Sequence, residues 1–568
     1  MYISEINIKN FRMFENLTLK FNKTLNVFVG PNNSGKTAIL DAIKYVLDTN
    51  SSEYIIIDRE NDFFRKDENT SADRFSIRLE FKDFNEREEG VFLPYLHYKK
   101  DEQDKIIPYL YLTLTCSKND ENKKGYIRKV WNTGKDGDGK DIESELKELL
   151  AITYLKPLRD AETELKSGKT SRLAKILEGY IDMKEADFES GDKEIFQKLK
   201  EFNDEIEQII EKQKGNDKKI SKTIKEEYLD KITIDGNKDI KLHIAHKDNK
   251  VKYREILNKM NLGYSNSLGK DGLGYQNILF MAAEMLLLAN SNDGYAPTLI
   301  IEEPEAHLHP QLQLKLLQYL KDLDTMQIFI STHSPNISSK VHIENLFLCQ
   351  DGKVFSLRPD ETVLNKEDYI FLEKFLDVTK ADMFFAKGLI FVEGLTEQLV
   401  LPRIAEKMGK NLTDKGISII NIGNTAFKRY ANVFKRKNSE EKINIPIAFI
   451  TDLDIKVYKN NDLKNQKEEI IEKRKSKEKD FNTDLHKIFI SQYKTFEVDW
   501  LNKNFHYMVN KLNAPKDIIG VKEVYEYIED NKKKSELAYN LNDFEIEDVP
   551  EYLKNAIDFV WEKYEYNK

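Results

Sequence analysis

The chain has 568 residues, too many for one hydrophobic core, so several domains are expected. Its composition, 40% hydrophobic and 33% charged, is that of a globular protein, and its formal net charge of −9 confines any nucleic-acid-binding surface to a local patch. The apolar run at residues 278–289 contains Glu284, the first residues lack a signal-peptide pattern, and Cys116 and Cys349 have no metal-ligand spacing. We therefore expect a cytoplasmic protein with no membrane segment.

The N-terminal part, residues 1–158, is predicted to mix strands and helices. Residues 2–11, 17–22, 75–81 and 109–116 alternate apolar and polar side chains, as half-buried strands do. Residues 25–30 predict a buried strand that ends at Gly30, and apolar residues recur at helical spacing over residues 34–47.

Residues 159–250 differ in composition, being rich in lysine, glutamate and isoleucine. Within them a short heptad seam is formed by Ile195, Leu199, Phe202, Ile206 and Ile209. This seam fits a helical insertion that dimerises, and it fits equally an amphipathic helix that packs on its own domain.

The α/β pattern returns in residues 251–378, where residues 297–302 and 326–331 predict strands that end in polar clusters. A last α/β unit is predicted over residues 379–568, with buried strands at 388–392 and 445–451. Residues 467–480 predict a charged helix or a mobile insertion with a solvated face.

Residues 30–37 fit the P-loop pattern completely, between a predicted strand and a predicted helix. In such a loop the glycines let backbone amides turn toward phosphates, Lys36 reaches the β- and γ-phosphates, and Thr37 binds magnesium. The predicted nucleotide-binding residues are Asn32, Asn33, Ser34, Gly35, Lys36 and Thr37.

A P-loop needs a second strand that carries carboxylates, and residues 298–305 supply one. Glu302 is placed to hold magnesium or its water, and Glu303 to orient or deprotonate the attacking water. Because an aspartate is usual at the first position, the longer Glu302 suggests contact through water. The alternative interpretation of Glu302 and Glu303 is two surface carboxylates at a strand end. His333 ends the next strand and is placed to contact the γ-phosphate.

These segments, together with residues 8–21, resemble the ABC-type ATPases of the SMC and RecF kind. In that family a helical insertion splits the ATPase, and a serine-glycine signature caps the γ-phosphate bound by another ATPase lobe. The matching stretch here is residues 267–277, in which Ser267 or Lys270 would cap the phosphate. A glycine-rich turn before a helix is the alternative interpretation of these residues.

Acidic residues follow both buried strands of the last unit. Glu393 ends the first strand and Glu397 lies four residues later, while Asp452 and Asp454 follow the second strand. Carboxylates gathered at neighbouring strand ends repel one another unless a cation neutralises them, and hard oxygen ligands suit magnesium or manganese. This order of elements resembles the Toprim fold.

An ABC-type ATPase followed by Toprim resembles the OLD family of ATP-dependent nucleases, which includes Gabija-type and retron-associated anti-phage nucleases. The resemblance implies a later acidic metal ligand, Glu497 with Asp499 beside it, and a later catalytic lysine. Lys534 fits that lysine best, with Lys533 and Lys554 as alternatives.

The resemblance implies an α/β enzyme in which ATP and Mg²⁺ or Mn²⁺ serve cleavage of nucleic acid, with DNA the expected substrate. Asp452, Glu393 and Glu397 would share one ion, and Asp454 and Glu497 would help hold the other. It also implies gating by the nucleotide state, a role in anti-phage defence, and a homodimer or higher homo-oligomer. A helicase-like protein or a retron RNA–DNA complex is a candidate partner.

Three other classes were compared with this one. A RecF- or SMC-like DNA clamp without nuclease activity does not need the second acidic cluster. An ABC transporter ATPase is disfavoured by the fused C-terminal unit, and a bacterial primase by the lack of a zinc-binding cysteine set in the sequence. A topoisomerase needs a nucleophilic tyrosine in a dedicated DNA-binding domain, and the 27 tyrosines of the chain do not decide whether one is present. Whether ATP activates or restrains cleavage stays open.

Overall fold

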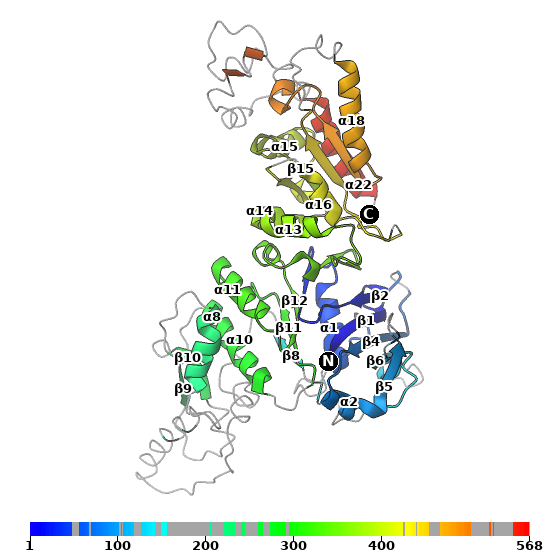
Figure 1. Cartoon of the computed structure of the whole chain (residues 1–568), viewed down its shortest axis with the longest axis vertical. Coiled ribbons are helices and arrows are strands. Elements are labelled where there is room, and N and C mark those ends of the chain that lie inside the picture. Colours follow the sequence, from blue (N-terminus) through cyan, green and yellow to red (C-terminus); the bar gives the residue numbers. More distant parts are fainter. Residues whose placement is uncertain are drawn as a thin grey trace. The chain divides into compact units, whose positions relative to one another are not determined.

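The computed structural model divides into two compact units (Figure 1). Unit 1 contains residues 1–28, 33–337 and 351–354, and unit 2 contains residues 29–32, 338–350 and 355–568. The described residues are 1–47, 56–67, 70–100, 104, 106–118, 127–141, 149–150, 152–155, 205, 209, 220–232, 240–244, 260–264, 273–290, 295–423, 426–438, 440–453, 466–500, 522–523, 526–527 and 549–566. Most of the predicted heptad seam, and Ser267, Lys270, Asp454, Lys533 and Lys534, lie outside them.

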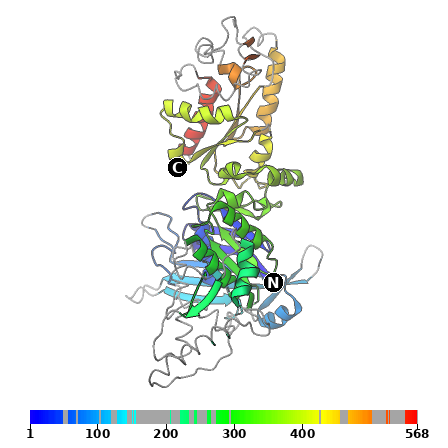
Figure 2. The same cartoon turned by 90° about the vertical axis from the view of Figure 1, so that its left-hand side faces the viewer.

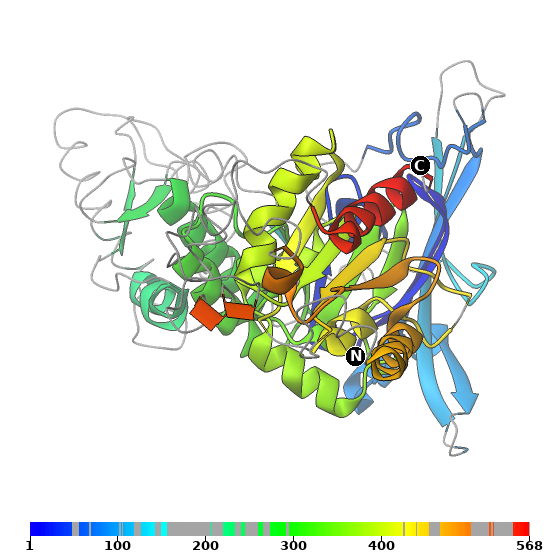
Figure 3. The ribbon, with the colours of Figure 1, turned by 90° about the horizontal axis from the view of Figure 1, so that it is seen from above.

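An antiparallel sheet opens unit 1, as the alternating sequence predicts (Figure 3). Its strands run in the order β2-β1-β4-β6-β5, and β7 also pairs with β6. Their apolar side chains fall on one buried face, so that Ile6 lies between Leu19 and Leu79 on its two neighbours. The strands are β1 (Tyr2–Phe11), β2 (Phe14–Lys20), β4 (Arg74–Lys82), β5 (Leu96–Lys100), β6 (Ile106–Lys118) and β7 (Ile127–Thr133).

A parallel sheet contains the strand that leads into residues 30–37. Strands β3 (Leu25–Val29), β12 (Gln327–Ser331), β11 (Thr298–Glu302) and β8 (Ile152–Leu155) neighbour one another in that order. The first three are buried at every position, which explains their continuous apolar sequence. The register pairs Glu302 with Ser331, so polar residues that follow these strands emerge at one edge of the sheet.

Helices accompany this sheet. The helix α1 (Lys36–Leu47) follows the P-loop, and α11 (Pro310–Lys321) packs against α8 (Asp230–Ile232). The remaining elements of this unit are α2 (Glu86–Phe92), η1 (Leu93–Tyr95), α7 (Ile220–Thr223), the π-helical turn η2 (Ile224–Leu229), β9 (Ile240–Ile244), β10 (Met260–Tyr264) and α10 (Leu273–Asn290). A short helix, α12 (Pro335–Ser338), follows β12.

A four-stranded parallel sheet forms the core of unit 2. Its order is β16 (Ile417–Asn421), β15 (Gly388–Val392), β17 (Ile447–Thr451) and β18 (His486–Ile490). The helix α22 (Glu551–Tyr566) packs against β15, β17 and β18, while α18 (Lys467–Phe481) packs against β18 from the other side (Figure 2). The register places the residues that follow β15, β17 and β18 at one edge.

The other elements of unit 2 surround this sheet. They are η3 (Ile343–Asn345), α13 (Lys366–Phe375), α14 (Val378–Ala381), η4 (Asp382–Phe384), α15 (Leu395–Lys407), η5 (Thr413–Lys415) and α16 (Phe427–Val433). The strand β13 (Leu346–Gln350) instead pairs with β3 in the six-stranded sheet that contains β12, β11 and β8. The strand β14 (Lys353–Ser356) crosses the boundary between the units. Within the described residues no helix is long and apolar enough to cross a membrane.

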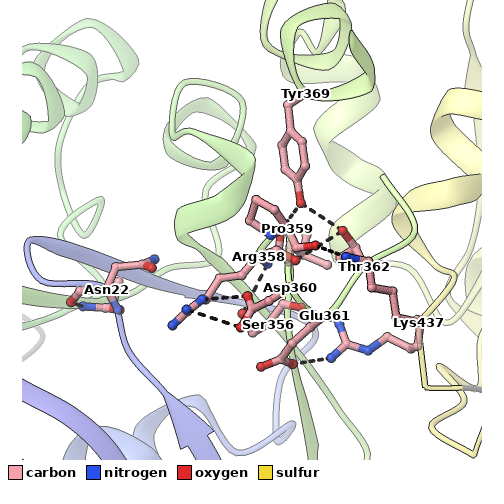
Figure 4. Close-up of polar contacts among 12 residues, drawn as sticks. Asn22, Ser356, Arg358, Pro359, Asp360, Glu361, Thr362, Tyr369 and Lys437 are labelled. Atoms are coloured by element: carbon pink, nitrogen blue, oxygen red, sulfur yellow. Dashed lines mark hydrogen bonds and ion pairs between the residues drawn. The ribbon is translucent and has the colours of Figure 1, made fainter. Parts of the chain in front are cut away.

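Polar contacts join residues 356–361 to the loop that follows α16, and Figure 4 labels Pro359 and Lys437 among the residues that make them. Arg436 follows α16, forms an ion pair with Glu361 and donates a hydrogen bond to the carbonyl of Ser356. Beside it, Lys437 Nζ donates to the carbonyl of Pro359 at 2.6 Å. Arg436 also pairs with Glu441 at 3.2 Å, so its buried charge has two carboxylate partners, and these contacts hold residues 356–361 and the loop after α16 together.

Candidate functional site

The P-loop has the backbone that its sequence predicts. Gly35 has φ +104°, and a Cβ atom there would lie 2.7 Å from Phe14 and 2.8 Å from Met13, so only glycine fits without strain. Asn33 also has a positive φ, of 59°, and α1 begins at Lys36. The buried Lys36 donates from Nζ to Ser34 Oγ at 3.4 Å. A tight loop therefore delivers a lysine and a helix start to one point, which suits phosphate binding.

Glu302 lies beside the start of α1 at the end of β11. The side chains of Tyr154 and Thr37 lower the pKa of its buried carboxylate, and the Oε1 atom of that carboxylate has no hydrogen-bond partner. Burial and the nearby charge of Asp41 raise the pKa of Glu302 to about 7. Thr37 therefore lies close to Glu302, and the unsatisfied oxygen of Glu302 fits a divalent cation or its water.

Glu303 and His333 also meet. Glu303 has φ +44°, an uncommon conformation for a residue with a side chain, and its Oε1 lies 3.8 Å from His333 Nε2. Burial and the charge of Lys36 lower the pKa of His333, while Glu303 acts in the opposite direction. The histidine is therefore held mainly neutral near neutral pH, close to both the lysine and the proposed water-orienting carboxylate.

The loop that carries His333 is fixed by two residues that sequence reasoning missed. Glu305 accepts hydrogen bonds from the His333 backbone N–H at 2.6 Å and from the Thr332 hydroxyl at 2.8 Å. Gln313 accepts from the Ser334 hydroxyl at 2.6 Å. Burial raises the pKa of Glu305, whereas these donors lower it. The only sequence signal for either role was the polar cluster that follows β11.

An arginine next to the P-loop helix was also missed. Arg12, in the turn between β1 and β2, binds Asp41 at 2.6 Å and Asp62 at 2.8 Å. Asp41 belongs to α1, and its charge adds to the effect of burial in raising the pKa of Glu302. Arg12 therefore balances the acidic side of α1 and fixes the helix that begins with Lys36.

The second acidic cluster gathers in unit 2 at the ends of β15 and β17. Asp452 follows β17, and its backbone N–H lies 3.4 Å from Glu393 Oε1, which also accepts a hydrogen bond from the Thr451 hydroxyl. Glu397 lies in the first turn of α15 and is buried. Burial and the charges of Glu397, Glu497 and Glu393, in that order, raise the pKa of Asp452 well above its ordinary value.

The later acidic pair divides into two environments. Glu497 is buried, accepts from the Thr495 hydroxyl at 2.7 Å and repels Asp452. Asp499 accepts backbone hydrogen bonds from Gln492 and, at 2.7 Å, from Tyr493, so its carboxylate holds the turn that follows β18. Of the two, Glu497 is the better placed to join the cluster.

The donor set fits a divalent cation. Hard carboxylate oxygens from three chain segments converge closely enough to repel one another, which a cation would offset. Among the described residues no three such side chains already stand at metal-ligand distances, and the predicted ligand Asp454 lies outside them. The alternative lysine Lys554 pairs with Glu551 at 3.2 Å on the surface of α22.

Two further side chains reach this cluster without a sequence signal. The hydroxyl of Tyr552 in α22 is buried with no hydrogen-bond partner. Burial, and then the nearby charges of the acidic residues, raise the pKa of this hydroxyl well above its ordinary value; the acidic residues are Asp499, Asp452, Glu397 and Glu497. Lys477 in α18 donates to the carbonyl of Asp452 at 2.5 Å. Tyrosine and lysine are abundant in this chain, so neither could be chosen without the fold.

Known families match both regions. A family model described as an AAA ATPase domain matches residues 1–338, and one described as an Overcoming lysogenization defect protein-like TOPRIM domain matches residues 384–454. Since the first spans more than half of the chain, the protein belongs to the AAA ATPase domain family. The chain is therefore an enzyme in which an ATPase domain precedes a Toprim domain of the OLD type, as predicted.

Similar proteins carry nuclease names. Endonuclease GajA of Bacillus cereus (strain VD045) is 23% identical over 453 residues, covering 76% of this chain and 72% of that protein. OLD nuclease of Thermus scotoductus is 24% identical over 447 residues, covering 75% and 78%. Old nuclease of Escherichia phage P2 is 24% identical over 488 residues, covering 80% and 77%.

The Glu305→Gln variant tests the support of the His333 loop. An amide offers one acceptor oxygen where the carboxylate offers two, so one of the two donors loses its partner, at a cost of about 1–3 kcal/mol in unfolding free energy. We expect kcat for ATP hydrolysis to fall about tenfold with KM little changed, because the loop and not the P-loop is disturbed. Wild-type kcat in a steady-state ATPase assay would contradict this role.

The Tyr552→Phe variant tests the buried hydroxyl. Since the hydroxyl has no partner, its removal should leave stability unchanged or raise it by about 1–2 kcal/mol, measured by urea unfolding without divalent cations. A loss of more than about 1 kcal/mol would show that the hydroxyl is hydrogen-bonded in solution.

Proposed function

We propose that this protein is an ATP-hydrolysing endonuclease that requires Mg²⁺ or Mn²⁺ and cuts nucleic acid, with DNA as the substrate class. The observation that carries this proposal is the convergence of Glu393, Glu397, Asp452 and Glu497 around one strand end. The Toprim match and the endonuclease names of the relatives support it. A RecF- or SMC-like clamp would have no use for these carboxylates.

The ATPase half would work through residues of β11, β12 and the P-loop. Lys36 and the amides of residues 32–35 would bind the phosphates, and Thr37 and Glu302 would hold the magnesium ion that neutralises them. Glu303 would orient or deprotonate the attacking water, and His333 would contact the γ-phosphate. The 3.8 Å separation of Glu303 and His333 supports a shared task.

The nuclease half would cut by two-metal phosphodiester chemistry. Divalent cations in such a site activate a water and stabilise the leaving oxygen. Glu393, Glu397 and Asp452 would hold one ion, while Asp454 and Glu497 would help hold the other. Lys534 would stabilise charge that develops on the phosphate. Asp454 and Lys534 lie outside the described residues, so their roles are carried over from the sequence alone.

We further propose a domain plan and an assembly. The ATPase would occupy residues 1–158 and 251–378, the helical insertion 159–250 and the Toprim domain 379–568. Ser267 or Lys270 would cap a phosphate bound by a second copy, which requires a homodimer or larger oligomer. Gating of cleavage by the nucleotide state, an anti-phage role in the cytoplasm, and a helicase-like or retron RNA–DNA partner extend this proposal.

Two substitutions separate nucleotide binding from turnover. Lys36→Ala should abolish nucleotide binding, because it removes the ammonium group that faces the phosphates. Glu303→Gln should keep binding and lose about 100-fold or more in turnover, since only the handling of water is disturbed. Fluorescent-nucleotide binding and phosphate release measure the two effects, with the exposed Lys9→Ala as control. Equal hydrolysis by wild type and Glu303→Gln would remove Glu303 from its role.

Loss of one carboxylate should stop cutting without unfolding the protein. Asp452→Ala and Glu393→Ala should reduce cleavage of supercoiled plasmid in Mn²⁺ by about 100-fold or more, because a ligand of the reacting ions is missing. ATP hydrolysis should persist and the metal-free melting temperature should stay equal or rise, since repulsion is relieved. The exposed Asp484→Ala is the matched control. Normal cleavage by Asp452→Ala would end the Toprim nuclease proposal.

A further inference from the structure

The charged helix α18 has one side that packs on the Toprim sheet (Figure 1). Ile470 near its start is buried, and the ring of Phe481 at its end lies 5.0 Å from that of Phe449 in β17. Contacts at both ends therefore fix the helix beside β17 and β18. The sequence indicated only a solvated face, which describes the exposed residues of α18 but not this side.

Cations on the packed side of α18 bind the ends of both strands. Arg474 Nη2 donates to the carbonyl of Ser491 at 2.8 Å, just after β18. Lys477, half-buried one turn later, donates from Nζ to the Thr451 hydroxyl at 3.2 Å and to the carbonyl of Asp452 at 2.5 Å, at the end of β17. The Ser491 hydroxyl in turn accepts from the backbone N–H of Leu453 at 2.7 Å.

These contacts connect Lys477 to the acidic cluster by a short path. The ammonium group donates a hydrogen bond to the Thr451 hydroxyl, and that hydroxyl donates a hydrogen bond to Glu393 Oε1. The ammonium group also bonds directly to the backbone of Asp452. One side chain thus restrains two carboxylates that repel each other, and a hydrogen-bonded support of this kind sets the position of metal ligands.

We propose that Lys477 is a positioning residue of the Toprim site, which holds Glu393 through Thr451 and holds Asp452 through its carbonyl. This role rests on the proposed cation site and assigns it a support that comes from α18. It differs from the role proposed for Lys534, because Lys477 acts on the ligands and not on the phosphate. A lysine that only anchored α18 would have no reason to act through the Thr451 hydroxyl.

Calorimetric titration of Mn²⁺ into the nucleotide-free full chain tests this role. Lys477→Met and Thr451→Val should each lower Mn²⁺ affinity about 10- to 100-fold. The affinity of the double variant should be no lower than that of whichever single variant binds Mn²⁺ less tightly. Thr451→Ser keeps the hydroxyl and should bind as the wild type does. Lys479→Met, an exposed lysine on the same helix, is the matched control and should also bind normally.

The direction of the change in Mn²⁺ affinity distinguishes a positioning role of Lys477 from a purely electrostatic effect of its charge. Removal of a positive charge alone would strengthen cation binding, so a loss of affinity reports displaced ligands. Wild-type affinity in both Lys477→Met and Thr451→Val, or additive losses in the double variant, would overturn the inference. If Lys477→Met fails to fold, Lys477→Gln takes its place, and wild-type Mn²⁺ affinity in that variant would overturn the inference. Absence of Mn²⁺ binding by the wild type would instead overturn the cation site itself, and this role with it.

Discussion

Burial of carboxylates at the ends of parallel strands, together with their mutual repulsion, is the constraint on which both candidate sites depend. It occurs twice in the chain: Glu302 follows a buried strand close to Asp41, and Asp452 follows another close to Glu393, Glu397 and Glu497. In each place the pKa is raised, so the protein holds these groups at a cost in free energy. Divalent cations would remove that cost, which links ATP use and phosphodiester cleavage to the same physical requirement.

The surrounding residues supply rigidity. The backbone N–H of Phe496 donates a hydrogen bond to Asp452 Oδ1 at 3.0 Å. Ion pairs from Arg12 to Asp41 and Asp62 fix the helix that begins at Lys36. Donors on other elements thus fix acidic side chains that we propose as cation ligands.

The sequence was informative where function depends on contiguous residues. The P-loop at residues 30–37, and acids placed directly after apolar runs at Glu302, Glu393 and Asp452, could be found because a buried strand leaves a readable pattern. Glu305, Tyr552 and Lys477 could not, since their roles depend on contacts between elements far apart in the chain. The roles predicted for all of these site residues stay predictions, and Ser267, Lys270, Asp454 and Lys534 also lie outside the part of the chain that the structure describes.

Thermal unfolding with and without Mn²⁺ tests the central claim most directly, because a cation that binds only the folded state must stabilise it. Nucleotide-free wild type and Asp452→Asn would be compared, since the amide keeps the shape of the side chain and removes its charge. We expect millimolar Mn²⁺ to raise the melting temperature of the wild type by several degrees and that of Asp452→Asn by much less. An equal shift in both proteins, or none in the wild type, would contradict a cation site at these strand ends.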